Sequence, residues 1–228
     1  IHLISSLPFF LIIFFNFKCK FVLRISGYPQ LNPVRKIFWR LCKNKIDFVF
    51  CPTEDTKNKL LEKNIFKEKS YRVLKDPVID VKKIKKLKTE KIETDLENKK
   101  YLINIGRLTK QKNQKLLIEA FSKISKFNSQ LNLVILGEGE LKANLQKIVK
   151  EKNLQSKIFF LGHVNNVYKY LYNAECFILS SKWEDPGFVI IEAAYLRKSI
   201  ISSNCPNGPK EILADGKGGY LFENDRLH

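Results

Sequence analysis

The sequence contains no methionine, only three histidines and no pair of cysteines at Cys-x2-Cys spacing. Its five cysteines are odd in number and scattered; they are Cys19, Cys42, Cys51, Cys176 and Cys205. This distribution indicates neither a disulfide framework nor a zinc site, and it favours a reducing cytoplasm. Because the chain begins at Ile1 and has no methionine, we interpret it as a fragment of a longer protein.

The chain also lacks an apolar run long enough to cross a bilayer, which takes about 20 residues. The most apolar stretch, residues 7–15, is much shorter. No basic region precedes it and no small-residue cleavage site follows it, so it is not typical of a signal peptide. We predict a buried helix or strand there. Shallow insertion into an anionic membrane surface is the alternative, because the net charge of +18 favours such lipid.

Acidic residues are few beside basic ones, with 23 Asp and Glu against 41 Lys and Arg. This excess raises the alternative of a basic nucleic-acid-binding module with aromatic stacking platforms. However, the lysines are spread along the chain without a nucleic-acid motif, and the aromatic residues fall mainly in apolar runs. We therefore expect no nucleic-acid partner.

Two glutamates stand eight positions apart across a Pro-Gly turn near the end of the chain. Pro186 suits the first turn of a helix, and Gly187 lets the backbone approach a ligand closely. This predicts Glu184 in the loop before a helix and Glu192 about one turn inside it. The free N–H groups of a helix start favour an anion such as a diphosphate, and the two carboxylates can accept hydrogen bonds from hydroxyl groups beside it. A nucleoside diphosphate sugar has these parts.

An earlier loop carries two cations. Residues 101–105 are typical of a buried strand, and Gly106, Arg107 and Lys112 follow before a helix. In a doubly wound sheet ligands gather at the carboxyl ends of the strands, so both cations could face phosphates held by the later helix. A glutamate near a helix start is stabilised by the helix dipole without any ligand. The cationic loop is what favours the ligand interpretation.

Together with three further motifs, these two resemble the nucleotide-binding domain of glycosyltransferase family 4, whose two-domain fold is called GT-B. The resemblance covers about residues 101–222. The further motifs, in the family's order, are Gly137-Glu138-Gly139, Leu161-Gly162-His163-Val164 and residues 205–211. The implied fold is α/β, with two Rossmann-like doubly wound domains. The first would be incomplete and the second would lack its closing helices.

The resemblance implies a role for each matching residue. Arg107 and Lys112 would neutralise the diphosphate, Glu184 would contact the donor sugar, and Glu192 would hold the ribose hydroxyls. Other residues expected in the nucleotide-sugar site are Gly106, His163, Gly187, Phe188 and Val189. A lone loop histidine such as His163 is more often structural or solvated. The implied reaction is retaining sugar transfer from a UDP- or GDP-type donor to a saccharide or lipid-linked acceptor, without a metal ion or other cofactor.

The pattern of strands and helices divides the chain into three parts. Residues 1–80 resemble the end of the acceptor-binding domain, residues 101–228 form the incomplete nucleotide-sugar-binding domain, and residues 81–100 are predicted to be a solvated, lysine-rich linker. Strands are predicted at residues 20–25, 47–51, 101–105, 131–136, 158–161, 176–179, 199–203 and 220–222. Helices are predicted at residues 34–43, 53–62, with Thr53 as N-cap, and 115–125, with Leu116, Leu117, Ala120, Phe121 and Ile124 in the core.

The sequence departs from the family at one position. Many members carry a histidine before glycine after the strand at residues 20–25, and here the dipeptide is Ser26-Gly27. Because Ser26 cannot be a cation near neutral pH, either this protein works without an imidazole there or its catalytic group lies in the N-terminal part expected to be missing. Arg107 and Lys112 could stabilise the departing diphosphate.

The expected setting is assembly of surface polysaccharide, lipopolysaccharide or glycolipid at the cytoplasmic side, with peripheral contact to anionic membrane. A sugar-nucleotide epimerase of the same fold is a further alternative, since its phosphate-binding residues would look similar.

Overall fold

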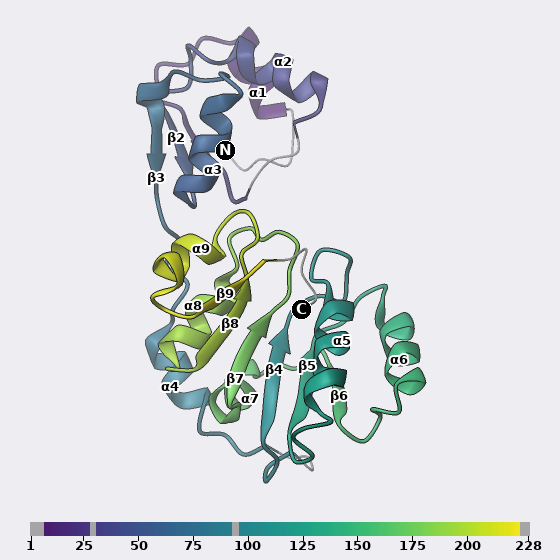
Figure 1. Ribbon diagram of the computed structural model, residues 1–228. Helices are drawn as coiled ribbons and strands as arrows, with labels where there is room; N and C mark the ends of the chain where they lie inside the picture. The colour runs from purple at the N-terminus through teal and green to yellow at the C-terminus, as the bar shows by residue number, and fades with distance from the viewer. Residues whose placement is uncertain (1–6, 28–30, 93–95, 224–228) are drawn as a thin grey trace. The chain divides into compact units, whose positions relative to one another are not determined.

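The computed structural model describes residues 7–27, 31–92 and 96–223, and it divides the chain into two compact units, Ile1–Pro77 and Val78–His228. Figure 1 shows both units as α/β structures. The predicted α/β class is therefore confirmed, and each unit is described separately below.

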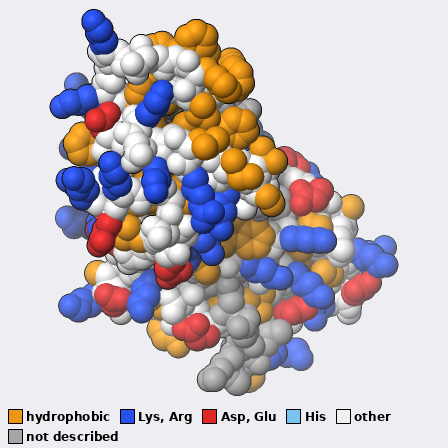
Figure 2. Space-filling view, turned by 90° about the horizontal axis from the view of Figure 1, so that it is seen from above, with side chains coloured by type: hydrophobic (Ala, Val, Ile, Leu, Met, Phe, Trp, Pro, Cys, Tyr) orange, Lys and Arg blue, Asp and Glu red, His pale blue; other side chains and the backbone are white. Residues whose placement is uncertain are grey.

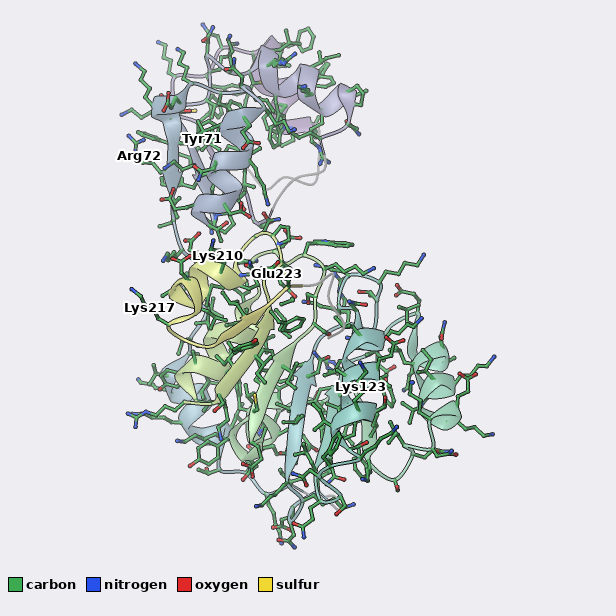
Figure 3. The ribbon with its side chains drawn as sticks, in the orientation of Figure 1. Tyr71, Arg72, Lys123, Lys210, Lys217 and Glu223 are labelled. Carbon is green, nitrogen blue, oxygen red and sulfur yellow. The ribbon has the colours of Figure 1, made fainter. Side chains whose placement is uncertain are left out.

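The first unit contains a three-stranded parallel sheet in the order β1-β2-β3, formed by Val22–Arg24, Phe48–Cys51 and Tyr71–Val73. Its helices are α1 (Leu7–Phe14), α2 (Pro33–Leu41) and α3 (Glu54–Glu62), and a 3-10 turn, η1 (Glu68–Ser70), precedes β3. Along β3 the side chains alternate, with Tyr71 buried and Arg72 exposed (Figure 3). Cζ of Arg72 lies over the Phe48 ring, 5.7 Å from the ring centroid.

Local signals start two of these helices. The side chain of Asn32 accepts a hydrogen bond from the backbone N–H of Arg35 at 2.8 Å, and Pro33 occupies the first helical position of α2. Thr53 caps α3 by accepting from the N–H of Thr56 at 3.1 Å, which confirms the predicted N-cap. Capping residues can be recognised from the sequence because their effect is local.

The apolar stretch at residues 7–15 forms a helix, but its predicted burial is only partly confirmed. Phe9 and Ile12 of α1 face the core, and Phe9 packs against Trp39 of α2 with ring centroids 5.9 Å apart. Ile13 is half-buried, and the remaining large side chains of α1 are exposed, namely Leu7, Phe10, Leu11 and Phe14. Among the described residues, no helix is both long and apolar enough to cross a membrane.

The second unit is built on a six-stranded parallel sheet in the order β6-β5-β4-β7-β8-β9. These strands are Tyr101–Ile105 (β4), Asn132–Leu136 (β5), Ile158–Gly162 (β6), Cys176–Leu179 (β7), Ser199–Ser203 (β8) and Tyr220–Phe222 (β9). All six lie within one residue of their predicted bounds. Such agreement is expected because a strand buried on both faces appears in the sequence as a continuous apolar run.

Helices cover the sheet in two layers (Figure 1). One core packs beneath α5 (Gln114–Ile124) and α6 (Lys142–Glu151). The other packs beneath α4 (Val81–Leu87), α7 (Val167–Asn173) and α8 (Phe188–Tyr195). A short helix, α9 (Pro209–Ile212), and the turn η2 (Ala214–Gly216) precede β9. In α5 the predicted core residues Leu117 and Phe121 are buried, but Ile124 is 46% exposed, so that part of the prediction is wrong.

Residues 81–100 differ from the solvated linker expected there. They begin with helix α4, whose N-cap Asp80 accepts from the N–H of Lys83 at 3.0 Å. Ile84, Ile92 and Leu96 are buried in the same core as β4 and α8. Three buried apolar side chains therefore make this lysine-rich segment part of the second unit, while most of its lysines are exposed.

Candidate functional site

The candidate site lies where the strand order of the larger sheet reverses. β4 and β7 are adjacent and parallel, with Leu102 opposite Cys176, and the chain leaves them towards opposite layers of helices. Ligands of doubly wound sheets bind in the crevice at this switch point, at the carboxyl ends of the strands. The loop after β4 carries Gly106, Arg107 and Lys112, and the loop after β7 carries Glu184. The fold thus brings together the two motifs predicted to face one ligand.

Three hydrogen bonds fasten these two loops to each other. The N–H of Lys182 donates to the carbonyl of Gln111 at 2.8 Å, and the Gln111 side chain donates to the carbonyl of Trp183 at 3.0 Å. The Ser180 hydroxyl donates to the carbonyl of Lys112 at 2.9 Å. The loops therefore form one structure although 68 to 72 residues separate the bonded partners.

Lys112 and Glu184 form an ion pair at the centre of the site. Lys112 Nζ lies 2.6 Å from Oε1 and 2.8 Å from Oε2 of Glu184. The Glu184 side chain is 4% exposed and that of Lys112 is 15% exposed. Ser181 Oγ also donates to the Glu184 carboxylate, and the N–H of Glu184 donates to the carbonyl of Pro206 at 3.0 Å. Glu184 is therefore a buried, multiply bonded acceptor rather than an exposed loop acid.

A glycine makes room for the lysine of this pair. A Cβ atom on Gly106 would lie 3.3 Å from both Cδ and Cε of Lys112, so the lysine stem passes directly over the Gly106 backbone. Gly106 thus contributes through its missing side chain.

Arg107 has a different environment from Lys112. Its side chain is exposed, and within residues 7–27, 31–92 and 96–223 its guanidinium makes no hydrogen bond or ion pair. Its backbone is anchored, since the carbonyl of Arg107 accepts from the Gln114 side chain at 3.0 Å. A fixed backbone with an unpaired guanidinium is suited to binding an anion from solvent.

A third loop supports the Arg107 backbone. It follows β5 and contains Gly137 and Gly139, whose added Cβ atoms would lie closer than 3.0 Å to the carbonyl oxygens of Gly106 and Leu108, respectively. The N–H of Leu108 donates to the carbonyl of Glu138 at 2.9 Å. Glu138 itself pairs with Lys142 at 2.9 Å. This motif therefore acts on the site through close backbone packing.

Helix α8 starts immediately after the Glu184 loop. Gly187 is its N-cap and has φ 91°, a left-handed conformation that favours glycine. The helix begins at Phe188, so Pro186 lies in the preceding loop, and its predicted place in the first helical turn is wrong. No side chain caps the start of α8. Phe188 is exposed and Val189 half-buried at this helix start. The N–H of Ile190 donates to the carbonyl of Gly187 at 3.0 Å, and the N–H groups before it have no partner within the helix.

Glu192 lies one turn inside α8, as predicted, and is half-buried. The Tyr168 hydroxyl donates to Glu192 Oε1 at 2.9 Å. Burial raises the pKa of the Glu192 carboxyl, while the Tyr168 hydrogen bond and the charge of Lys83 lower it. The sequence did not indicate Tyr168 or Lys83, because they come from α7 and from the segment interpreted as a linker. Their approach to Glu192 depends on tertiary packing.

The remaining predicted residues lie at other places. His163 is exposed and follows β6, which is separated from β4 by β5. Ser26 is exposed just beyond β1 in the first unit. Among the described residues no three His, Cys, Asp or Glu side chains cluster to hold a metal ion, and all five cysteines are free. An apolar cleft of about 570 Å³ lies on the α5 face of the sheet, lined by Leu117, Phe121 and Leu221 among others. Neither Lys112 nor Glu184 lines this cleft.

A doubly wound sheet with a cation and carboxylate pair at its switch point defines a Rossmann-like α/β protein with a site suited to an anionic ligand. The model of the family "Glycosyl transferases group 1" matches residues 85–227, and the chain belongs to this family. The recognition made from the sequence motifs is thereby confirmed.

Two curated relatives illustrate the similarity. An uncharacterized glycosyltransferase of Methanocaldococcus jannaschii is 36% identical over 171 residues, which are 73% of this chain and 42% of that protein. An N-acetylgalactosamine-N,N'-diacetylbacillosaminyl-diphospho-undecaprenol 4-alpha-N-acetylgalactosaminyltransferase of Campylobacter jejuni is 38% identical over 126 residues, which are 55% of this chain and 34% of that enzyme. The chain spans less than half the length of either relative.

Solved structures show the same fold. The crystal structure of Anabaena HepE in complex with UDP and glucose matches with a TM-score of 0.72 at 16% identity, covering 90% of this chain and 58% of that one. The structural neighbours are glycosyltransferases of the GT-B fold, which confirms the predicted architecture.

Proposed function

We propose that this chain is the donor-binding part of a glycosyltransferase. The enzyme would move a sugar from a nucleoside diphosphate sugar, of UDP or GDP type, to a saccharide or lipid-linked acceptor. The observation that carries the proposal is the Lys112–Glu184 pair at the switch point, beside the unpaired Arg107 and the uncapped start of α8. Family membership supports transfer over the epimerase and nucleic-acid alternatives. The proposed transfer proceeds with retention and needs no metal ion.

The geometry suggests how a diphosphate would be held. A lysine ammonium has three N–H donors, and two of those on Lys112 point to Glu184, which leaves one for a phosphate oxygen. Arg107 supplies a second cation and the start of α8 supplies backbone donors. Each charge-assisted hydrogen bond contributes about 1.5–3 kcal/mol, so the two cations supply roughly half of the 8 kcal/mol of micromolar binding.

The same groups would act in the transfer step. The bond between the anomeric carbon and the diphosphate oxygen breaks, and the acceptor hydroxyl oxygen bonds to that carbon on the same face of the sugar while its proton passes to the departing diphosphate. Negative charge then collects on the leaving diphosphate, where Lys112, Arg107 and the α8 N–H groups stabilise it. Glu184, held by Lys112 and Ser181, would accept hydrogen bonds from sugar hydroxyls and orient the ring.

Two comparisons support the substrate classes. HepE was crystallised with UDP and glucose, which together represent the parts of a nucleotide-sugar donor. The Campylobacter relative is named for an undecaprenol diphosphate acceptor, a lipid-linked saccharide. We propose the corresponding classes for this protein, acting at the cytoplasmic side in polysaccharide or lipopolysaccharide synthesis.

Nucleotide binding to the purified chain tests this proposal. Thermal unfolding with UDP, GDP and ADP, each with and without EDTA, should show stabilisation by one nucleotide that EDTA does not change. Arg107→Ala should weaken that nucleotide by about tenfold to a hundredfold, the loss of one charge-assisted hydrogen bond. The exposed Lys110 on the same loop provides the matched control, and Lys110→Ala should bind normally. Equal affinities of the two variants would contradict the site assignment.

We also propose peripheral contact with an anionic membrane through the α1–α2 surface, defined by the exposed side chains Leu7, Phe10, Phe14, Val34, Ile37 and Leu41. Neither helix contains an acidic residue, and α2 carries Arg35, Lys36 and Arg40. Figure 2 shows hydrophobic side chains gathered on one side of the face in view and many basic ones beside them. Apolar residues with a basic rim match an anionic bilayer surface.

Vesicle sedimentation tests this surface. The chain should sediment with vesicles of phosphatidylcholine and phosphatidylglycerol, less with phosphatidylcholine alone, and less as salt rises. Phe10→Ser with Phe14→Ser, whose rings lie 4.4 Å apart, should reduce sedimentation. Phe127→Ser provides the control, because Phe127 is 92% exposed and lies in the second unit. An equal loss in both variants would argue against the α1–α2 surface.

A further inference from the structure

We propose that Tyr168 is a positioning residue for ribose recognition, holding Glu192 so that its second carboxylate oxygen accepts a ribose hydroxyl. The inference rests on the proposed function, since it concerns the same donor site. Tyr168 Oη donates to Glu192 Oε1 at 2.9 Å, and within the described residues Oε2 of Glu192 accepts no hydrogen bond. One oxygen is thus committed to the protein, and the other is left for a ligand.

The backbone of Tyr168 is itself held in place. Asn166 caps α7 by accepting from the N–H groups of Tyr168 at 3.0 Å and Lys169 at 3.3 Å. The amide of Asn166 also donates to the carbonyl of Leu87 and to Glu90 Oε2, each at 2.8 Å. The start of α7 is therefore tied to the segment that follows α4. A phenol on an anchored helix start can fix the carboxylate it contacts more closely than a side chain on a free loop.

The charge states suit this role. The pKa of Tyr168 is raised to about 12, first by burial and then by the adjacent Glu192 and by Asp80, so the phenol stays protonated and donates throughout the neutral range. Burial raises the pKa of Glu192, and Tyr168 from α7 and Lys83 from α4 oppose that shift. Tyr168 therefore both orients Glu192 and favours its ionised form, which is the better acceptor for a hydroxyl group.

Loss of the phenol hydroxyl should be visible in two measurements. The relevant ligand is whichever of UDP, GDP and ADP binds the wild type. Tyr168→Phe should lower the affinity for that nucleotide by about tenfold, a coupling of about 1.4 kcal/mol. It should leave the affinity for the 2′,3′-dideoxy analogue unchanged, because that analogue has no hydroxyl for Glu192. The acid limit of ribonucleotide binding should also move to higher pH, because removing Tyr168 removes a group that lowers the pKa of Glu192.

Calorimetric titration across pH provides the test, with Tyr172→Phe as the matched control. Tyr172 lies on the same helix, and Lys88 and Lys198 contact its ring, so the same chemical change should leave both affinities and the pH profile as they are in the wild type. In a Glu192→Ala background, Tyr168→Phe should have no further effect.

The outcomes separate this inference from the proposed function. If Tyr168→Phe weakened the ribonucleotide and the dideoxy analogue equally, the effect would be general and the positioning role would be overturned. If Tyr168→Phe changed neither the ribonucleotide affinity nor the acid limit of binding, the positioning role would be overturned as well. The proposed function would still stand in that case, because the wild type binds nucleotide. Failure of every nucleotide to bind the wild type would overturn the proposed function, and this inference with it.

Discussion

Lys112→Ala should weaken nucleotide binding by about tenfold to a hundredfold and lower the free energy of unfolding by about 3–5 kcal/mol, the usual cost of leaving one partner of a buried ion pair alone. Lys112 places its ammonium within 2.8 Å of both oxygens of Glu184, whose side chain is 4% exposed. Without the lysine, a desolvated carboxylate would keep the hydrogen bond from Ser181. Urea unfolding and nucleotide titration of the same preparation would measure both effects.

A double variant distinguishes binding from stability. Lys112→Met with Glu184→Gln removes both charges while keeping similar volumes, and such replacements of buried pairs are often close to neutral for stability. We expect most of the lost stability to return and nucleotide binding to stay as weak as in Lys112→Ala, because no cation is restored. If the double variant bound nucleotide like the wild type, Lys112 would have no role in the donor site.

Gly208→Ala should disrupt the same site from the loop after β8 and cost about 3 kcal/mol or more, through overpacking and backbone strain. Gly208 has φ 143°, and an added Cβ would lie closer than 3.0 Å to the carbonyl oxygen of Pro186. The clash is with backbone atoms, so it can be relieved only by moving the loop that carries Glu184. Stability and nucleotide affinity should therefore both fall.

Gly216→Ala provides the matched control. Gly216 also has a positive φ, of 94°, but no other atom lies within 4 Å of the place that an added Cβ would occupy. Its substitution should cost only the backbone term of about 1 kcal/mol and leave nucleotide affinity unchanged. Equal effects at the two glycines would mean that close packing against Pro186 does not hold the site.

Loop 205–208 thus supports Glu184 twice, through the Pro186 contact and through the hydrogen bond from the N–H of Glu184 to the carbonyl of Pro206. Two charged residues near this loop contact residues other than Glu184. Lys210 Nζ of α9 lies 3.8 Å from Asp215 Oδ1, and Glu223 Oε1 accepts a hydrogen bond from the Asn204 amide at 2.8 Å (Figure 3). The proposed donor site is therefore assembled from four loops, which follow β4, β5, β7 and β8.

The sequence predicted much of the fold because its signals are local. Apolar runs located all six strands of the larger sheet, Thr53 marked the start of α3, and Gly187 marked the start of α8 within one residue. The linker prediction for residues 81–100 failed because only three apolar residues, Ile84, Ile92 and Leu96, direct that segment into the core. Three apolar residues are too sparse to give a clear periodic signal, and lysines dominate the local composition.

By itself, the sequence predicted that the larger unit is a parallel α/β sheet, and it placed on the loops after β4 and β7 the residues that we propose bind an anionic ligand. Only the tertiary structure paired Lys112 with Glu184, 72 positions apart, and set Tyr168 and Lys83 around Glu192. The physical reason is range. Strand and cap signals act over a few neighbouring residues, whereas hydrogen bonds, burial and the resulting pKa changes depend on segments that meet only after the sheet has formed.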